Sequence, residues 1–304
     1  MRIKPLSAVL AALVLFLVPI AGGAPAAAQG RPLPPVLDVH ITPEGFTVPG
    51  PNPRAGGPLT FRVTAEGAPG YWWTIYKLRN GATLQQFVEW MAQSASPDPA
   101  IALPAVRALY ENVDYSGGAK IHPGDTVELT QNMTPGIYYF GSQAVWGAQR
   151  AAAAPAAAPS PFGWLEVTGE VAPARMPKID GVVSMKRLHD RNIMLAPVSA
   201  PANGRLLVRN DTDQPQEAVF LELAPGATDR DIQEYFDAEL EGRPLPPRPF
   251  YDSVGGMLAL SPGKELVLKP GLPPGRYGIF SWLREPETGI DSAALGMHRV
   301  ITLR

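Results

Sequence analysis

A set of sequence landmarks occurs twice in the same order, and this internal repeat constrains the fold more than any other feature of the chain. Each half holds a Gly-Ala-Thr triplet before a helix-like segment, then a Gly-Gly pair, a Pro-Gly turn and a Pro-Gly-x-Tyr segment. The paired copies stand at 81–83 and 226–228, 117–118 and 255–256, 123–124 and 262–263, and 135–138 and 274–277. Ordered landmarks at a nearly constant offset indicate repeated structural units. We therefore predict two homologous domains, at 36–169 and 174–304.

Between these landmarks, short segments alternate apolar and polar side chains, as half-buried strands do. The clearest of them are 59–63, 126–130 and 265–268. Pro and Gly, at 35 and 30 of the 304 residues, supply turns between the segments. Short strands joined by Pro-Gly turns predict an all-β fold in which each domain is a β-sandwich.

Two segments depart from the strand pattern. Apolar residues recur at helical spacing after Thr83 and again after Thr228, and both threonines are suitable N-caps. This predicts one short helix in each domain, at 84–91 and 232–240. The Ala- and Pro-rich run 150–161 falls between two expected strands of the first domain, so we interpret it as a loop within that domain.

The order of strands, inserted helix and turns resembles the secreted bacterial cupredoxin-like domains. The resemblance spans nearly all of the chain after the first thirty residues. It implies two Greek-key β-sandwich domains, each with a short inserted helix. It also implies a copper site in each domain, built from two imidazoles, a thiolate and often a thioether.

Carried across position by position, the resemblance does not supply a complete copper ligand set. The first imidazole would fall at Tyr71 or Trp72 in the first domain and at Gln216 or Glu217 in the second. The thiolate would fall at Ser142 and Ser281, and the chain has no cysteine. In the second domain the thioether position retains Met297. We therefore expect no copper cofactor and no electron carrier.

The principal hypothesis is a non-catalytic binding or structural protein whose site lies at the loop end of each domain, where the metal would have been. Loops at one end of a rigid sandwich are a common place for recognition, and Trp and Tyr offer large contact area with a hydrogen bond. The candidate ligand-binding residues are Tyr71, Trp72, Ser142, Trp146, Gln216, Glu217, Ser281 and Trp282. A cell-envelope glycan or protein is the partner that such a surface would suit.

Two other hypotheses remain open. The first is a metal-binding or redox protein with a rebuilt site around His298, Met297 and Glu217. The second is a hydrolase using Ser142 or Ser281, but the chain has no Gly-x-Ser-x-Gly motif at either and no assignable triad. His122 precedes a Pro-Gly turn, and we expect it to be an exposed turn residue.

The first thirty residues have the pattern of a secretory signal peptide. Arg2 and Lys4 precede an apolar run at 8–20, and small residues follow at 26–28, so we expect cleavage after Ala28 and a secreted mature protein. The apolar run is shorter than the roughly 20 residues that span a bilayer. We expect no membrane span in the mature chain.

Charge excludes one further class of partner. The chain has 26 Lys and Arg against 28 Asp and Glu, with a formal net charge of −2. This balance does not indicate the excess of positive charge that binding to nucleic-acid phosphates requires.

Overall fold

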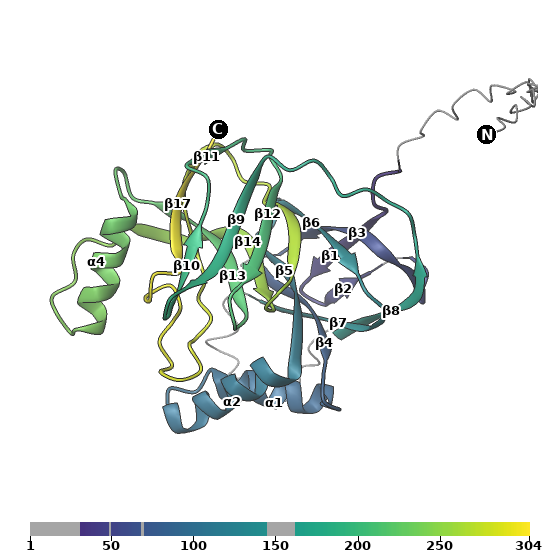
Figure 1. Cartoon of the computed structure of the whole chain (residues 1–304), viewed down its shortest axis with the longest axis horizontal. Helices are drawn as coiled ribbons and strands as arrows, with labels where there is room; N and C mark the ends of the chain where they lie inside the picture. The colour runs from purple at the N-terminus through teal and green to yellow at the C-terminus, as the bar shows by residue number, and fades with distance from the viewer. Residues whose placement is uncertain (1–30, 49, 68–69, 145–161) are drawn as a thin grey trace, which may run out of the picture. The chain divides into compact units, whose positions relative to one another are not determined.

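The computed structural model describes residues 31–48, 50–67, 70–144 and 162–304, and residues 32–304 form one compact unit (Figure 1). The predicted signal peptide and the loop 150–161 lie outside the described residues. No helix in the described part of the chain is long and apolar enough to cross a membrane. The predicted all-β class is confirmed, because strands make up most of the structure.

The first half, 36–171, contributes strands to two sheets. The strands are β1 (Val36–Thr42), β2 (Gly45–Thr47), β3 (Arg54–Ala65), β4 (Tyr71–Leu78), β5 (Val113–Ile121), β6 (Thr126–Met133), β7 (Gly136–Ala144) and β8 (Phe162–Val171). One sheet has the order β2-β1-β3-β6, with β1 parallel to β3. The other has the order β8-β7-β4-β5, and the start of β3 also pairs with β8.

The second half, 181–303, repeats this arrangement. Its strands are β9 (Gly181–Leu188), β10 (Arg191–Leu195), β11 (Ser199–Ala200), β12 (Leu206–Asp211), β13 (Gln216–Leu223), β14 (Phe250–Leu260), β15 (Glu265–Lys269), β16 (Gly275–Phe280) and β17 (His298–Leu303). One sheet has the order β10-β9-β12-β15. The other has the order β11-β17-β16-β13-β14.

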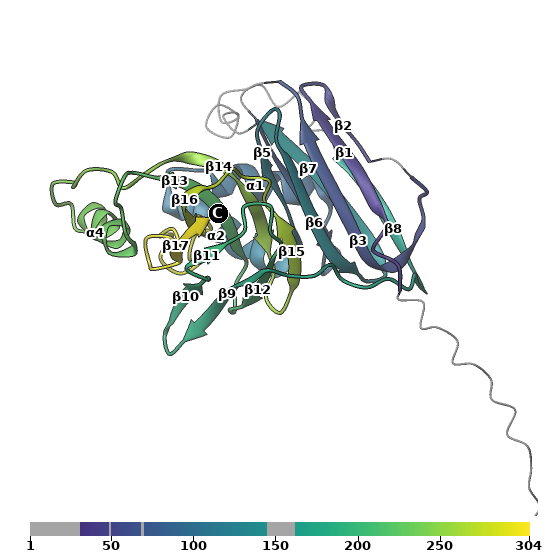
Figure 2. The same cartoon turned by 90° about the horizontal axis from the view of Figure 1, so that it is seen from above.

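Both sheets continue from one half into the other. Strand β6 pairs antiparallel with β15, and β5 pairs antiparallel with β14 (Figure 2). We call these two pairings the junction. The strand order on one side of the junction mirrors the order on the other, so strands at corresponding repeat positions meet there.

The repeated Gly-Gly pairs lie in the junction strands β5 and β14. A Cβ on Gly118, at φ +152°, would lie 2.1 Å from the carbonyl oxygen of Trp73 on β4. A Cβ on Gly256, at φ +126°, would lie 2.4 Å from the carbonyl oxygen of Ala218 on β13. The neighbouring backbone therefore leaves room only for glycine at these positions.

Helices α1 (Leu84–Ser94) and α4 (Asp229–Leu240) form where the sequence predicts them. Thr83 and Thr228 each close a capping box, with Gln86 and Asp231 respectively. The first half also contains α2 (Pro99–Asn112), a second helix that the sequence pattern did not predict. Pro104 inside α2 obscured the helical pattern, although the N-cap Asp98 and Pro99 at the first helical position are good start signals.

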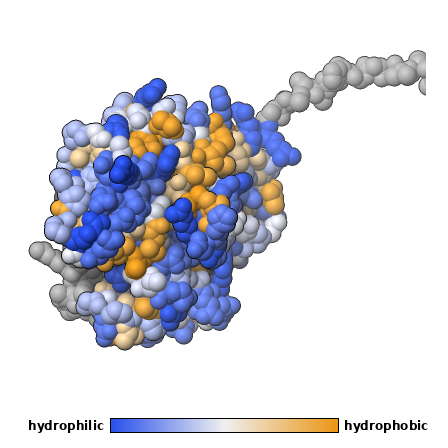
Figure 3. Space-filling model, turned by 60° about the vertical axis from the view of Figure 1, so that its left-hand side comes forward, coloured by the Kyte–Doolittle hydropathy of each residue, from blue (hydrophilic) through white to orange (hydrophobic). Residues whose placement is uncertain are grey.

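The core lies between the two sheets and runs through both halves. It includes Phe61, Trp73 and Phe140 from the first half and Phe220 and Tyr277 from the second, all at most 2 % exposed. Smaller apolar clusters lie beneath α4 and beneath the pair α1 and α2. The face in Figure 3 shows hydrophobic patches interspersed with hydrophilic side chains.

Candidate functional site

In the first half, the predicted site residues do not form an exposed surface. Tyr71 and Ser142 are each 6 % exposed, and Tyr71 belongs to the central core together with Trp73. Trp72 points to the opposite face, as strand alternation requires, and packs against the cluster beneath α4 of the second half. Its buried Nε1 has no hydrogen-bond partner. Trp146 lies outside the described residues.

In the second half, the structure brings several predicted residues together at one end of the sandwich. The Ser281 hydroxyl accepts a hydrogen bond from the backbone N–H of Glu217 at 3.0 Å, and the Ser281 N–H donates to the carbonyl of Met297 at 3.0 Å. The N–H of Trp282 donates to the Glu217 carboxylate at 3.3 Å. Gln216 and Ser281 are fully buried, so they cannot belong to an exposed binding surface. This corrects the expected role of both residues.

These residues do not fit a blue-copper site. Met297 retains the thioether, but Gln216 offers an amide and Ser281 a hydroxyl where the site would need an imidazole and a thiolate. The amide nitrogen and oxygen of Gln216 are both buried without a hydrogen-bond partner. We therefore derive no chemistry through copper at this position.

The rebuilt metal site around His298, Met297 and Glu217 is not assembled either. His298 faces α4, with its Nε2 3.0 Å from Oε1 of Gln233 and its Nδ1 3.9 Å from Oδ1 of Asp229. Met297, the neighbouring residue, is instead part of the central core. Among the described residues, no group of three or more His, Asp or Glu side chains is arranged to hold a metal ion.

His122 is not simply an exposed turn residue, as the sequence suggested. It is partly buried, and its Nε2 lies 2.9 Å from the carbonyl oxygen of Ser253 in the other half. The contact lies across the β5–β14 pairing. His122 therefore has a structural contact at the junction.

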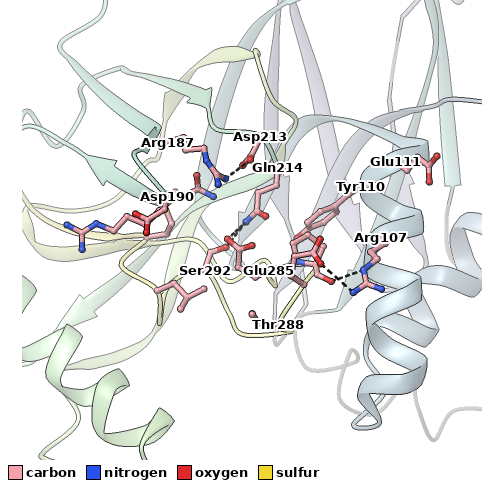
Figure 4. A pocket seen from close by; sticks show the side chains of 16 residues that line it. Arg107, Tyr110, Glu111, Arg187, Asp190, Asp213, Gln214, Glu285, Thr288 and Ser292 are labelled. Atoms are coloured by element: carbon pink, nitrogen blue, oxygen red, sulfur yellow. Dashed lines mark hydrogen bonds and ion pairs between the residues drawn. The ribbon is translucent and has the colours of Figure 1, made fainter.

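Sequence reasoning missed a pocket of about 840 Å³ at the loop end of the second half. We call it the polar pocket because most of its lining residues are polar or charged, with Pro286, Leu295 and Met297 as the apolar ones. Its walls come from the β9–β10 turn, the β12–β13 connection, α2 and the segment 285–297 (Figure 4). Because α2 belongs to the first half, both halves build this site. No local motif marks it, since its residues are distant in sequence and meet only when the sheets join.

Hydrogen bonds hold the interior of the polar pocket in place. The buried Gln214 donates through Nε2 to Oε1 of Glu285 at 3.1 Å and to the hydroxyl of Ser292 at 3.2 Å. Arg187 pairs with Asp213 beside them. Burial, and next the charge of Asp213, raise the pKa of the Glu285 carboxyl.

Two hydrogen bonds connect α2, which forms one wall of the polar pocket, to the second half. The Tyr110 hydroxyl donates to the carbonyl oxygen of Arg284 at 2.7 Å. The Nε of Arg107 donates to the carbonyl oxygen of Pro286 at 3.0 Å. These contacts fix the segment that carries Glu285 against a helix of the other half.

Two further charged residues, Lys120 on β5 and Glu217 on β13, lie near the junction. Lys120 is 6 % exposed, and burial lowers its pKa to about 8. Burial raises the pKa of Glu217 to about 7, while the N–H of Trp282 and the charge of Lys120 oppose that shift. Each side chain therefore carries its charge in an environment that disfavours it.

No protein-family model matches the sequence, and no curated protein matches it. Solved structures to which it is similar include a multicopper oxidase, at 15 % identity and a TM-score of 0.23, covering 88 % of each chain. A copper-containing nitrite reductase from Thermus scotoductus is similar at 12 % identity and a TM-score of 0.25, over 88 % of this chain and 61 % of that one. Auracyanin B is similar at 19 % identity and a TM-score of 0.23, over 40 % of this chain and 88 % of that one.

Proposed function

We propose that this chain is an exported, non-catalytic binding protein built on two copper-free, cupredoxin-like domains. The observation that carries the proposal is the polar pocket. Its lining includes Met297, the thioether position of the family resemblance, whereas Gln216 and Ser281 are buried outside the lining. A small-molecule site needs a shaped cavity with a few well-placed polar groups, and a blue-copper role needs ligands that Gln216 and Ser281 do not offer.

The surroundings of the two serines support a non-catalytic role. Ser281 uses its hydroxyl to accept the N–H of Glu217. Within the described part of the chain, neither the Ser142 nor the Ser281 hydroxyl is hydrogen-bonded to a histidine that could serve as a general base. The hydrolase hypothesis therefore gains no support from the geometry.

Export is part of the proposal and rests on the N-terminal sequence pattern. N-terminal sequencing of the protein recovered from outside its native cell tests this part. We expect the first residue to be Gln29, after removal of the signal peptide. Recovery of the chain inside the cell with Met1 retained would contradict export. A cell-envelope glycan or protein remains the proposed kind of partner.

Elemental mass spectrometry tests the copper-free part. The mature protein is incubated with copper and then zinc, excess metal is removed, and a blue copper protein is carried through as a positive control. We expect no stoichiometric metal. One tightly held copper per chain, lost on His298→Ala, would instead establish the rebuilt metal site of the alternative hypothesis.

A further inference from the structure

The polar pocket contains a carboxylate without a cationic partner. Asp213 is paired with Arg187, and Glu287 lies 3.8 Å from Arg107. Glu285 lies between these pairs in the lining, and in the described structure no Lys, Arg or His nitrogen comes within 4.0 Å of its carboxylate. Its Oε1 accepts a hydrogen bond from the neutral amide of Gln214. Glu111 and Asp190 of the lining also form no ion pair in the described structure, but Glu285 is the one joined by hydrogen bonding to the buried Gln214.

A second and independent feature of the same lining is an acceptor without a donor. Asn192, on β10, lines the polar pocket and is 7 % exposed. Its Oδ1 is buried and has no hydrogen-bond partner. A buried carbonyl oxygen left unpaired costs free energy, because it has lost its hydrogen bonds to water. A ligand that donates a hydrogen bond to it would recover part of that cost.

The size of the pocket points to an organic ligand. A volume of about 840 Å³ far exceeds the space a single metal ion needs, and ligand pockets for small organic molecules span about 300–1,000 Å³. The lining also has apolar parts, including Leu295 and Met297. These can contact the hydrocarbon portion of a molecule whose charged end reaches Glu285.

We propose that the polar pocket binds an organic cation, with its ammonium or guanidinium group held by the carboxylate of Glu285 and the Oδ1 of Asn192. The inference rests on the proposed binding function and names the chemistry of the ligand. Such a group carries only donors and a positive charge, which matches an unneutralised carboxylate and an unpaired carbonyl. The cation can belong to a free polyamine or to the basic side chain of a peptide.

Isothermal titration calorimetry on the mature, full-length protein tests the proposal. The probes are spermidine, N-acetylated trilysine amide, the neutral sugar maltotriose and citrate. We expect one site for at least one of the two cationic probes. Glu285→Gln should weaken that binding at least tenfold while its amide oxygen still accepts from Gln214. Glu222→Gln removes an exposed acid outside the pocket and should leave the affinity unchanged.

A second variant and a measurement on the unaltered protein keep the test decisive if Glu285→Gln folds poorly. Asn192→Ser should weaken cation binding severalfold, and hydrogen exchange should show that spermidine or trilysine protects 285–292. Binding of spermidine alone identifies a free amine, and binding of trilysine alone identifies a peptide side chain; both support the proposal.

Failure of the inference is distinguishable from failure of the proposed function. Absence of binding by both cationic probes at millimolar concentration overturns the inference, as does cation binding that Glu285→Gln and Asn192→Ser leave unchanged. If maltotriose or citrate binds instead and protects 285–292, the cation inference falls while the binding function stands.

Discussion

At the scale of single residues, the structure places two opposing charges where each is poorly solvated. Lys120 on β5 and Glu217 on β13 come from different halves, and each influences the pKa of the other. No contact within 4.0 Å joins them in the described structure. Burial dominates both shifts, so the pair does not fully compensate for the loss of water.

These shifts predict how stability depends on pH. A carboxyl whose folded-state pKa rises from 4.5 to about 7 holds its proton more tightly when folded. Its stabilisation is therefore complete below pH 4.5 and is lost as the pH rises toward 7. We expect the unfolding free energy of the protein to fall by roughly 2–3 kcal/mol more than that of Glu217→Gln between pH 4.5 and 7.5.

Urea unfolding at several pH values measures this difference, because the other carboxyls contribute alike to both proteins. Glu222→Gln is the control for removing an exposed acid and should follow the unmodified protein. Parallel curves for the protein and Glu217→Gln would contradict the prediction.

Lys120 affects stability in a different pH range. Its pKa is about 8 in the folded protein and 10.5 in the unfolded chain, so the unfolding free energy rises as the pH rises between these two values.

Individual residues also show what a sequence can and cannot reveal. Tyr71 and Trp72 lie on opposite faces of β4, which follows from the sequence alone because the side-chain period of a strand is fixed. It could not show that Trp72 packs beneath α4 of the other half, since that contact depends on how the sheets join. The same holds for Glu285 and Asn192, which are 93 positions apart and have no recognisable motif.

At the scale of elements, the repeated landmarks correspond to backbone requirements. The Gly-Ala-Thr triplets precede capped helices, and the Gly-Gly pairs lie in the two strands that meet at the junction. These features could be recognised in the sequence because helix capping and glycine conformation depend on neighbouring residues in the chain. Helix α2 was not predicted, since Pro104 interrupts its pattern and the helix packs against β5 and forms hydrogen bonds to the second half.

The glycines of the junction give the next prediction. Gly118→Ala would bring a Cβ to 2.1 Å from the carbonyl oxygen of Trp73, at a φ that alanine rarely adopts. Strands β4 and β5 would have to separate locally, and we expect a loss of more than about 2 kcal/mol of unfolding free energy. Gly169→Ala on β8 is the control, because a Cβ there meets nothing within 4 Å.

Thermal and urea unfolding of both variants measure the effect. We expect the control to stay within about 0.5 kcal/mol of the unmodified protein. Equal stability of Gly118→Ala and Gly169→Ala would show that the close approach of β4 to β5 does not constrain the strand.

At the scale of the whole molecule, the two halves share both sheets and one core. Gly117 of the first half faces Leu266 of the second so closely that a Cβ would lie 2.5 Å from it. Ion pairs also join residues of the two halves across the junction. Lys264 lies 2.8 Å from the buried Asp114, while Arg205 and Lys269 each lie 3.8 Å from Glu128. The two predicted domains therefore contact each other through both sheets, through the core and through ion pairs.

We expect the ion pair between Asp114 and Lys264, which adds to the pair of Asp114 with Arg79 in its own half, to favour pairing between unlike halves. The repeat puts Asp125 of the first half at the position that Lys264 occupies in the second. Two copies of the first half pairing through β5 would therefore bring Asp125 of one copy toward Asp114 of the other. Like charges in this partly buried position disfavour self-association.

This arrangement predicts the behaviour of the separated halves. Residues 31–173 and 174–304, made as separate chains, each expose two long strand edges and one side of the core. We expect neither to be a monomer with a cooperative unfolding transition, and we expect their co-expression to give a 1:1 complex that unfolds in one transition. Analytical ultracentrifugation and calorimetry distinguish these states.

Lys264→Asp in the second fragment should weaken the complex, because it places a second carboxylate against Asp114. Lys178→Asp is the control, because it makes the same charge change at a residue that forms no ion pair in the described structure. A stable, monomeric half would mean that the junction is a contact between independent domains.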